Sequence, residues 1–273
     1  MIEGFEFKDK YGFDDLVRIV SILRSPGGCP WDREQTHKSI RANFIEETYE
    51  AVEAIDTDDP DLLKEELGDV MLQVALHSQI ESETGRFDIS DVADGVCRKL
   101  IVRHPHVFGD LSVNTTGEVL KNWDEIKKRT KNQKTNTETL ESVPRVLPAL
   151  MRSEKVQKRA ARAGFDWRDV SGAVSKAHEE LGELETEIKK GDKAACLDEL
   201  GDLLFSVVNI ARFLEVEPEE ALTSSCDKFI KRFALCEKMA AENGGDFKKM
   251  SLEQIDELWE KAKDVLQSEA GKP

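Results

Sequence analysis

The sequence predicts an all-α protein made of two tandem, related helical units of the antiparallel helix-bundle type. Apolar residues recur with the period of an α-helix along most of the 273-residue chain, and no useful stretch alternates like a strand. An acidic block also occurs twice, because residues 43–76 align without a gap on residues 176–209. The two segments share ten identities in 34 positions, where average composition gives about two. The repeat therefore predicts two units with a common plan.

The first unit is expected to span residues 1–129. Helices are predicted at residues 13–24, 35–55, 61–84, 88–103 and 115–129. The segment SPGGCP at Ser25 to Pro30 ends the first of them, and DTDDP at Asp56 to Pro60 forms a tight turn between the second and third. One face of the third helix carries apolar residues at offsets 0, 4, 7, 8 and 11, namely Leu63, Leu67, Val70, Met71 and Val74.

A polar linker is predicted at residues 130–145, and a second helical unit at residues 146–273. Helices are expected near residues 172–190, 194–214, 218–242 and 251–267. The turn KKGDK at Lys189 to Lys193 joins the first two of these helices as antiparallel neighbours. The apolar stripe of the first unit recurs at Cys196, Leu200, Leu203, Leu204 and Val207, which predicts core packing for Cys196.

Composition excludes several classes of protein. A net charge of -16 and a pI near 4.9, without any Lys/Arg run, disfavour a nucleic-acid partner. Five cysteines without a C-x-x-C pair predict reduced thiols in a cytoplasmic protein. No signal peptide is expected, and the most apolar stretch, residues 203–214, is too short to span a membrane. A phosphate-binding P-loop is also absent from the sequence.

The repeated acids have the spacing of a metal site. Glu180 and Glu183 are three residues apart and lie on one face of a helix, and Glu199 and Asp202 do the same on the next helix. Because the turn between these helices makes them antiparallel neighbours, the four carboxylates are expected to converge. The first unit repeats this quartet with Glu47, Glu50, Glu66 and Asp69. Ligands that are all oxygen suit Mg²⁺, with Mn²⁺ as a substitute. A single acidic motif in so charged a chain is usually a solvated helix face, but its duplication favours the metal site.

The repeat also keeps a glycine in the middle of a helix. Gly68 and Gly201 lie between the Glu and the Asp of the second acidic block in each copy. Each lowers helix stability by about 1 kcal/mol relative to Ala. Close approach of a partner helix or a ligand would explain them.

Basic and aromatic residues recur in the same order after each acidic block. The pairs are Lys99 with Arg103, Lys228 with Arg232, Trp123 with Lys127, and Trp259 with Lys263. Each pair is four residues apart and shares a helix face. The bases suit a triphosphate and the Trp side chains suit stacking on a nucleobase. The alternative, in which the Trp residues anchor the core and the bases are surface charges, stays equally open.

At this point the chain resembles the MazG family, the two-domain nucleoside triphosphate pyrophosphohydrolases of bacteria. The resemblance covers almost the whole chain. The motifs that carry it beside the acidic blocks are GCPWDREQTH at Gly28 to His37, GRFD at Gly85 to Asp88, RHPHVFGD at Arg103 to Asp110, LPAL at Leu147 to Leu150 and AGFDW at Ala163 to Trp167.

The resemblance implies Mg²⁺-dependent hydrolysis of NTPs and dNTPs to the monophosphate and pyrophosphate, a homodimer, and a housekeeping role toward noncanonical nucleotides. It matches both acidic quartets to metal ligands, and Lys228, Arg232, Trp259 and Lys263 to substrate contacts. In this family the second unit is often the main catalytic one and the first weak or silent. The second copy has Lys176 where the first has Asn43. If Lys176 contacts phosphate, the first site lacks that contact and binds triphosphate less well.

As a hypothesis, Glu179 or Glu180 orients or deprotonates the attacking water, and Lys228 and Arg232 meet the charge of the departing pyrophosphate. The nearest alternative is a related enzyme with a narrower substrate range, such as a dCTP or phosphoribosyl-ATP pyrophosphohydrolase. A non-catalytic acidic scaffold would bind Mg²⁺ without turnover. A di-iron bundle needs paired E-x-x-H sequences, and only Glu34 to His37 fits.

Overall fold

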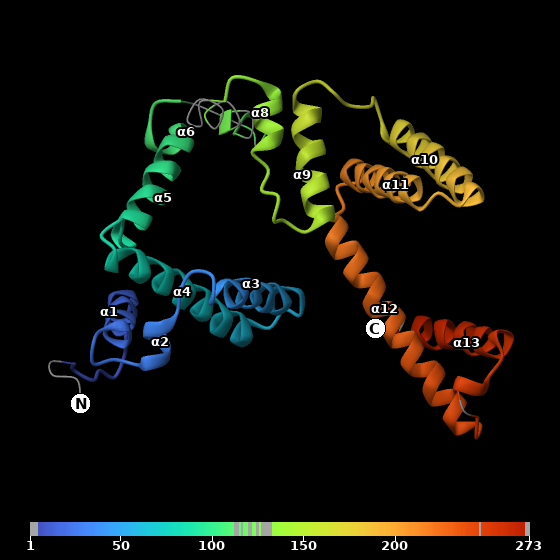
Figure 1. Cartoon of the computed structure of the whole chain (residues 1–273), viewed down its shortest axis with the longest axis horizontal. Helices are drawn as coiled ribbons and strands as arrows, with labels where there is room; N and C mark the ends of the chain where they lie inside the picture. The colour runs from blue at the N-terminus through green and yellow to red at the C-terminus, as the bar shows by residue number, and fades with distance from the viewer. Residues whose placement is uncertain are drawn as a thin grey trace. The chain divides into compact units, whose positions relative to one another are not determined.

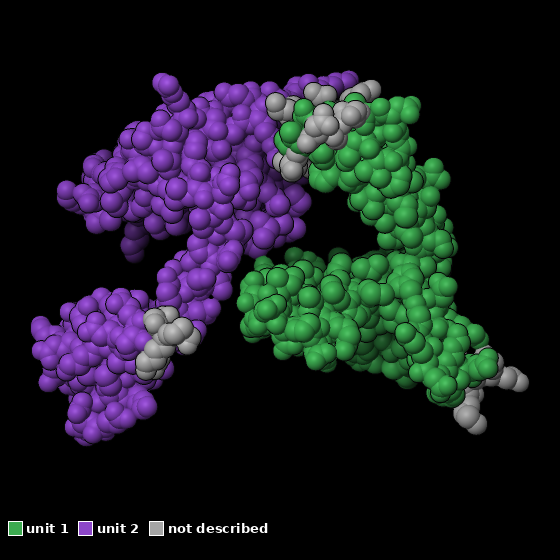
Figure 2. All heavy atoms as spheres, turned by 180° about the vertical axis from the view of Figure 1, so that it is seen from behind, with its two compact units in different colours: residues 1–127 green, residues 128–273 purple. Residues whose placement is uncertain are grey.

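A computed structural model of the chain describes residues 5–111, 115, 117–119, 122, 123, 126, 133–245 and 247–270, with only the backbone of 269 and 270. The regular structure of these residues is helical, without a strand, which confirms the predicted all-α class (Figure 1). The chain divides into two compact units, residues 1–127 and 128–273, coloured separately in Figure 2. The domain boundaries at residues 129 and 146 stay a prediction.

Unit 1 contains a helical hairpin with shorter helices around it. Its described helices are α1 (Phe13–Arg24), α2 (Pro30–Glu34), α3 (Arg41–Asp56), α4 (Pro60–Glu83), α5 (Ile89–Arg103) and α6 (Pro105–Phe108). Much of the helix predicted at 115–129 lies outside the described residues, and so does Lys127.

The turn between α3 and α4 is held by local hydrogen bonds. Asp59 is the N-cap of α4, and its Oδ1 accepts from the backbone N–H groups of Asp61 at 3.1 Å and Leu62 at 3.0 Å. Pro60 begins the helix, where its missing N–H costs nothing. Asp58 adopts a left-handed φ of 53°, which reverses the chain. These contacts make α3 and α4 antiparallel neighbours.

The core of unit 1 lies where α1 and the start of α3 pack on α4. Val20, Ile40, Ala75 and Leu76 are buried there. Arg24, at the end of α1, joins this core to the GCPWDREQTH segment. Its guanidinium donates to Glu83 at 2.7 and 2.8 Å, and to the carbonyl oxygens of Asp32 and Gln35.

A second polar contact ties the same segment to α4. The Nδ1 atoms of His37 and His77 lie 2.6 Å apart and their rings stack, while Nε2 of His37 lies 2.5 Å from the buried carboxylate of Glu81. Phe44 packs its ring near that of His77. Burial, and then the charge of His37, lower the pKa of His77 below its usual 6.5.

Unit 2 repeats the hairpin and adds a second helix pair. Its described helices are α8 (Asn136–Glu141), α9 (Ala149–Arg162), α10 (Val170–Lys190), α11 (Lys193–Phe213), α12 (Pro218–Glu242), a 3₁₀ turn (Phe247–Lys249) and α13 (Leu252–Ala270). Helix α8 lies inside the predicted linker. Arg159 of α9 holds it by donating to Thr139 and Ser142.

The turn between α10 and α11 copies the one in unit 1. Gly191 has a left-handed φ of 76°, at the position aligned with Asp58. Asp192 caps α11 by accepting from Ala194 and Ala195 at 3.0 and 3.1 Å, as the aligned Asp59 caps α4. One acid of the repeat is therefore a helix cap.

Helices α12 and α13 form the other packed pair of unit 2. Their contact buries Cys236, Ala240, Leu258 and Ala262, and Trp259 packs against this cluster. Helix α9 packs on both α11 and α12 and so joins the two pairs.

The apolar stripes of the hairpins remain largely open in the single chain. Leu200, Leu204 and Val207 of α11 are 44, 50 and 49% exposed, and Leu67 of α4 is 49% exposed. Cys196 is only half-buried, so its predicted place in a core is only partly realised. In each unit, the aligned apolar stripe thus leaves much of its surface unburied.

The mid-helix glycines do not mark a helix contact within the chain. Apart from the adjacent backbone of its own helix, a Cβ added to Gly68 or Gly201 would meet no described atom within 4 Å. The predicted close approach of a partner helix is therefore wrong for the single chain, and the open space leaves room for a ligand or a second copy. None of the described helices has the length and apolar character that crossing a membrane requires.

The depressed pKa of His77 predicts a loss of stability in mild acid. The unfolded chain binds a proton near pH 6.5 that the folded unit resists, so stability is complete above that pH and falls as the pH drops toward the folded pKa. The midpoint temperature of thermal unfolding should be lower at pH 5.5 than at pH 7.5, and the difference should be smaller in His77→Phe. The exposed His178, changed to Phe, is the control. Equal pH dependence in all three proteins would contradict the assignment.

Candidate metal centre

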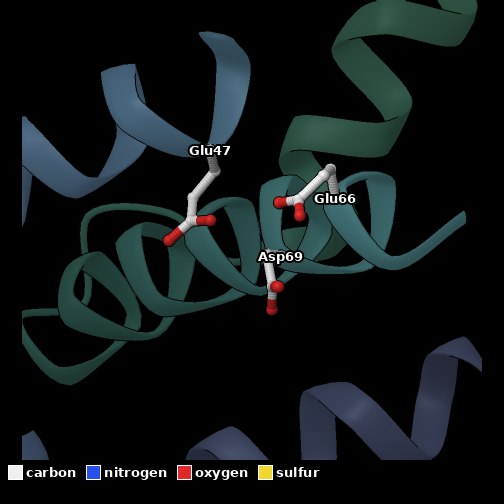
Figure 3. Close-up of side chains that lie close together, drawn as sticks. All are labelled: Glu47, Glu66 and Asp69. Atoms are coloured by element: carbon white, nitrogen blue, oxygen red, sulfur yellow. The ribbon is translucent and has the colours of Figure 1, made fainter. Parts of the chain in front are cut away.

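The hairpin of unit 1 brings three carboxylates together. Glu47 comes from α3, and Glu66 and Asp69 come from α4. One oxygen of each lies within 4.8 Å of the others. Figure 3 shows Glu47 and Glu66 turned toward each other across the two helices, with Asp69 beside them. The i, i+3 spacing of the two acids of α4 puts them on one face, and the antiparallel turn places Glu47 opposite.

Unit 2 builds the same arrangement from the aligned residues. Glu180 of α10 and Glu199 and Asp202 of α11 again place one oxygen each within 4.8 Å of the others. Glu180 is 4% exposed and Glu66 of unit 1 is 9% exposed, so each cluster has one buried carboxylate. A buried carboxylate beside two others requires a positive partner.

The fourth acid of each predicted quartet lies next to its cluster. Burial, and then the charges of Asp69 and Glu50, raise the pKa of Glu47. In unit 2, burial and then the charges of Glu183 and Glu180 raise the pKa of Glu199. The charges of Glu50 and Glu183 therefore reach the clusters, although their oxygens lie outside the three-carboxylate groups.

The two clusters differ in one positive charge. Lys176 donates to Glu179 at 2.9 Å and lies 2.5 Å from Glu180, and these contacts raise the pKa of the lysine. The aligned residue of unit 1, Asn43, carries no charge. In unit 1, burial and then Glu50 raise the pKa of Glu66, the buried acid of that cluster. Lys176 thus offsets part of the negative charge in unit 2 alone.

The donor set indicates which ligand the clusters suit. The grouped ligand atoms are carboxylate oxygens, which hard divalent cations prefer over softer metals. Burial and then repulsion between the carboxylates raise the pKa values of Glu47, Glu66 and Glu199, and a cation between the carboxylates would offset that repulsion. The residues present therefore fit a bound metal ion.

The basic and aromatic residues of unit 2 lie on the other helix pair. Lys228 and Arg232 are on α12, and Trp259 and Lys263 are on α13. The Arg232 guanidinium lies 5.8 Å from the centre of the Trp259 ring, and Lys263 pairs with Glu260. Figure 1 shows α12 leading away from the α10–α11 hairpin toward α13. Within unit 2 these four residues therefore lie on the α12–α13 pair, whereas the carboxylates lie on the α10–α11 hairpin.

In unit 1 the corresponding residues follow the hairpin. Lys99 and Arg103 lie on α5, which packs on α4. Trp123 packs edge-on against His104 with ring centres 4.9 Å apart, and its indole N–H is buried without a partner among the described groups. The core-anchor interpretation of Trp259 agrees with its place in the α12–α13 cluster.

Comparison with known proteins places the fold and the two clusters in a family. The model of the MazG nucleotide pyrophosphohydrolase domain matches twice, at residues 35–108 and 169–236. Each match contains one acidic hairpin, so the repeat found in the sequence corresponds to two copies of one domain.

Three relatives share the sequence over most of this chain. The "nucleoside triphosphate pyrophosphohydrolase/pyrophosphatase MazG" of Thermotoga maritima is 47% identical over 251 residues, 92% of this chain and 95% of that protein. The "nucleoside triphosphate pyrophosphohydrolase" of Escherichia coli K12 is 43% identical over 253 residues, 92% of this chain and 96% of that protein. The uncharacterised YabN of Bacillus subtilis is 49% identical over 254 residues, but the match covers 52% of its length.

The resemblance drawn from the motifs is thereby confirmed. The family model covers residues in both halves of the chain, and relatives at more than 40% identity cover over nine-tenths of it. The chain belongs to the MazG family of nucleotide pyrophosphohydrolases.

Proposed function

We propose that the chain hydrolyses nucleoside and deoxynucleoside triphosphates at the α-phosphate, releasing the monophosphate and pyrophosphate, with Mg²⁺ or in its place Mn²⁺. The observation that carries the proposal is the carboxylate cluster that the chain builds twice. The names of the relatives from Thermotoga maritima and Escherichia coli support the same reaction. A housekeeping role in clearing noncanonical nucleotides follows from the family resemblance.

The second unit is proposed as the main catalytic site. Glu180, Glu183, Glu199 and Asp202 would hold the cation there, and Glu47, Glu50, Glu66 and Asp69 would hold it in the first unit. When bound, the cation supplies charge neutralisation for the triphosphate and a more acidic water. A chain with a net charge of -16 needs such a positive centre to admit a polyanion.

The residues of the chain have separate tasks in this proposal. Glu179 lies outside the three-carboxylate group, is exposed, and accepts from Lys176 at 2.9 Å. Its assigned task is to orient or deprotonate the attacking water. Glu180 is the alternative base, although its burial beside Lys176 favours a role as a ligand. Lys176 would exchange its contact with Glu180 for a phosphate oxygen. Asn43 lacks that charge, which supports a weaker first site.

The remaining predicted contacts favour a homodimer. Lys228, Arg232, Trp259 and Lys263 lie on a helix pair that leads away from the hairpin, so α12 and α13 of a second copy would supply them to the carboxylates. In unit 1, Lys99, Arg103, Trp123 and Lys127 would have the corresponding role. The exposed apolar stripe of α11 and the open space beside Gly201 support such a contact.

Partners and place in the cell follow from charge and chemistry. The acidic chain is proposed to act on free nucleotides and not on nucleic acid. The described cysteines are free thiols, which supports the cytoplasm as the compartment. Two alternatives are an enzyme with a narrower substrate range and a scaffold that binds Mg²⁺ without turnover. A panel of all NTPs and dNTPs distinguishes them, because the first hydrolyses only a few of these substrates and the second hydrolyses none.

Loss of one buried carboxylate should stop catalysis in the second unit. Glu180→Gln keeps the size of the side chain but removes a ligand charge, so pyrophosphate release per enzyme should fall more than about 100-fold. Glu47→Gln should cost less, because the first site is the weaker one. Glu185→Gln, an exposed acid on the same helix, is the control. If Glu180→Gln, Glu47→Gln and the double variant all keep the wild-type rate, the site assignment is wrong.

Mg²⁺ should stabilise the folded chain by relieving carboxylate repulsion. The raised pKa of Glu199 means that its ionisation opposes folding at neutral pH, and this loss disappears as the pH falls through the folded pKa. The midpoint temperature of thermal unfolding at pH 7.5 should therefore rise when Mg²⁺ is added and return to its metal-free value when EDTA removes the ion. Glu199→Gln should be at least as stable as wild type without Mg²⁺ and should gain less from it. An unchanged Mg²⁺ shift in Glu199→Gln would contradict the proposal, and Glu185→Gln is the matched control.

The proposed dimer depends on the apolar stripe of α11. Light scattering after size exclusion should give a mass of twice the 30.8 kDa of the chain. Leu204→Glu places a charge in the stripe and should yield the monomer, because a buried unpaired carboxylate is costly. Val146→Glu is the control, since Val146 is 79% exposed in a loop outside the stripe. A Leu204→Glu variant that keeps the dimer mass would place the interface elsewhere.

A further inference from the structure

The carboxylate cluster of unit 2 contains a positive charge that belongs to the chain itself. Lys176 lies one helical turn before Glu180 on α10, and its Nζ is 2.5 Å from Oε1 of that buried carboxylate. The same ammonium donates to Glu179 at 2.9 Å. Because Glu180 is a member of the three-carboxylate group, the ammonium lies at the edge of the place where a cation would bind. The lysine is therefore an internal counter-ion of this cluster.

The aligned cluster of unit 1 has no such counter-ion among the described residues. Position 43, which corresponds to Lys176, is an asparagine. The lysine and arginine ion pairs of the described part of unit 1 use acids outside the cluster, namely Asp15, Asp61, Glu81, Glu83 and Asp94. Within that part of the unit, no ammonium or guanidinium is at ion-pair distance from Glu47, Glu66 or Asp69.

A second lysine near the hairpin of unit 2 does not change this comparison. Lys190 pairs with Glu187 at 2.5 Å, so the two charges cancel. The aligned residues of unit 1 are Thr57 and Ala54, which are both uncharged. Lys176 is therefore the charge that distinguishes the two groups of carboxylates at close range.

The counter-ion weakens the binding of a cation to unit 2. Mg²⁺ binds a carboxylate oxygen at about 2.1 Å, and Lys176 already lies within hydrogen-bond distance of Glu180. Two positive charges on one carboxylate repel each other, most strongly where burial lowers the dielectric, and Glu180 is 4% exposed. A cation must bind against that repulsion or displace the ammonium from its contacts. Neither cost arises in unit 1, where the cation alone offsets the three carboxylates.

A triphosphate removes this disadvantage of unit 2. Its phosphate oxygens are anionic acceptors, so the Lys176 ammonium would bond them in place of Glu180. The released carboxylate is then open to the cation that accompanies the triphosphate. The two ligands therefore favour each other in unit 2, because linkage requires each of them to raise the affinity for the other by the same factor.

We propose that Lys176 weakens cation binding in unit 2 until a triphosphate arrives, whereas unit 1 binds a divalent cation tightly in the absence of nucleotide. Unit 2 takes the complex of the cation with the triphosphate as its substrate. Unit 1 is a resident cation site, in which the ion ties Glu47 of α3 to Glu66 of α4. The inference rests on the proposed pyrophosphohydrolase function, because it names the form in which the substrate of unit 2 arrives.

Mn²⁺ binding without nucleotide tests the difference between the two units. The ion is titrated into the whole chain, and free Mn²⁺ is measured by electron paramagnetic resonance. The wild type should bind one Mn²⁺ per chain at least about tenfold more tightly than the next. Lys176→Asn gives unit 2 the residue that unit 1 carries naturally, so the weaker Mn²⁺ should bind at least about tenfold more tightly than in the wild type.

The reciprocal change identifies which unit holds the tight site. Asn43→Lys places an ammonium one turn before Glu47 and should weaken the tight Mn²⁺ about tenfold. Lys189→Asn is the control, because Lys189 is exposed and follows Glu180 by nine residues, which puts it on the opposite face of α10. It should leave both affinities unchanged. The unfolding midpoint of each variant shows that the chain is folded during the titration.

A second measurement separates the proposed role from a merely structural one. With saturating Mg²⁺, Lys176→Asn should bind α,β-methylene-ATP, an analogue that cannot be cleaved between its α- and β-phosphorus atoms, about tenfold more weakly than the wild type. The variant therefore gains affinity for the free ion and loses affinity for the triphosphate. Loss of structure would lower both affinities together.

Two Mn²⁺ sites of equal affinity in the wild type, or an unchanged weaker site in Lys176→Asn, would overturn the inference. A chain that shows the expected Mn²⁺ affinities but releases no pyrophosphate from any triphosphate with Mg²⁺ would instead overturn the proposed function, and the difference between the two cation sites would stand.

Discussion

Repulsion between carboxylates across a tight helical hairpin is the constraint on which both sites depend. In each unit the hairpin turn is capped by an aspartate and the helices are antiparallel, so the acids of one helix face those of the next. Burial first, and then the charges of the neighbouring carboxylates, raise the pKa values of Glu47 and Glu199. A divalent cation held there, as proposed, would turn the same repulsion into binding energy and would let a very acidic chain accept a polyanion.

The two units have kept this hairpin and changed what surrounds it. Unit 2 places Lys176 against Glu180, whereas unit 1 has Asn43 at the aligned position. Unit 1 instead fixes the GCPWDREQTH segment to α4 through Arg24 and the His37–His77 pair. One unit therefore carries an extra charge at the carboxylates, and the other carries an extra anchor for a neighbouring segment. This division agrees with a catalytic second unit and a first unit of weaker activity.

The incomplete burial of the chain points in the same direction. Apolar stripes on α4 and α11 remain about half exposed, and the glycines beside them have open space. The basic residues of α12 and α13 lie apart from the carboxylates of their own hairpin. Association of two copies would cover the stripes and bring bases to acids in one step, so the proposed dimer and the proposed active site depend on the same surfaces.

The sequence by itself determined the helical class, the repeat and the two acidic groups, because helix periodicity and i, i+3 spacing are local properties of the chain. Asp59 and Asp192 occupy aligned positions of the repeat, and only the turn geometry shows that they are helix caps. The partner of Lys176, the half-exposed stripes and the burial of Gln157 were decided by tertiary structure. A lone glutamine such as Gln157 has no periodic or motif signal that could reveal that its Oε1 is buried without a partner among the described groups, because that burial depends on α9 packing on α11.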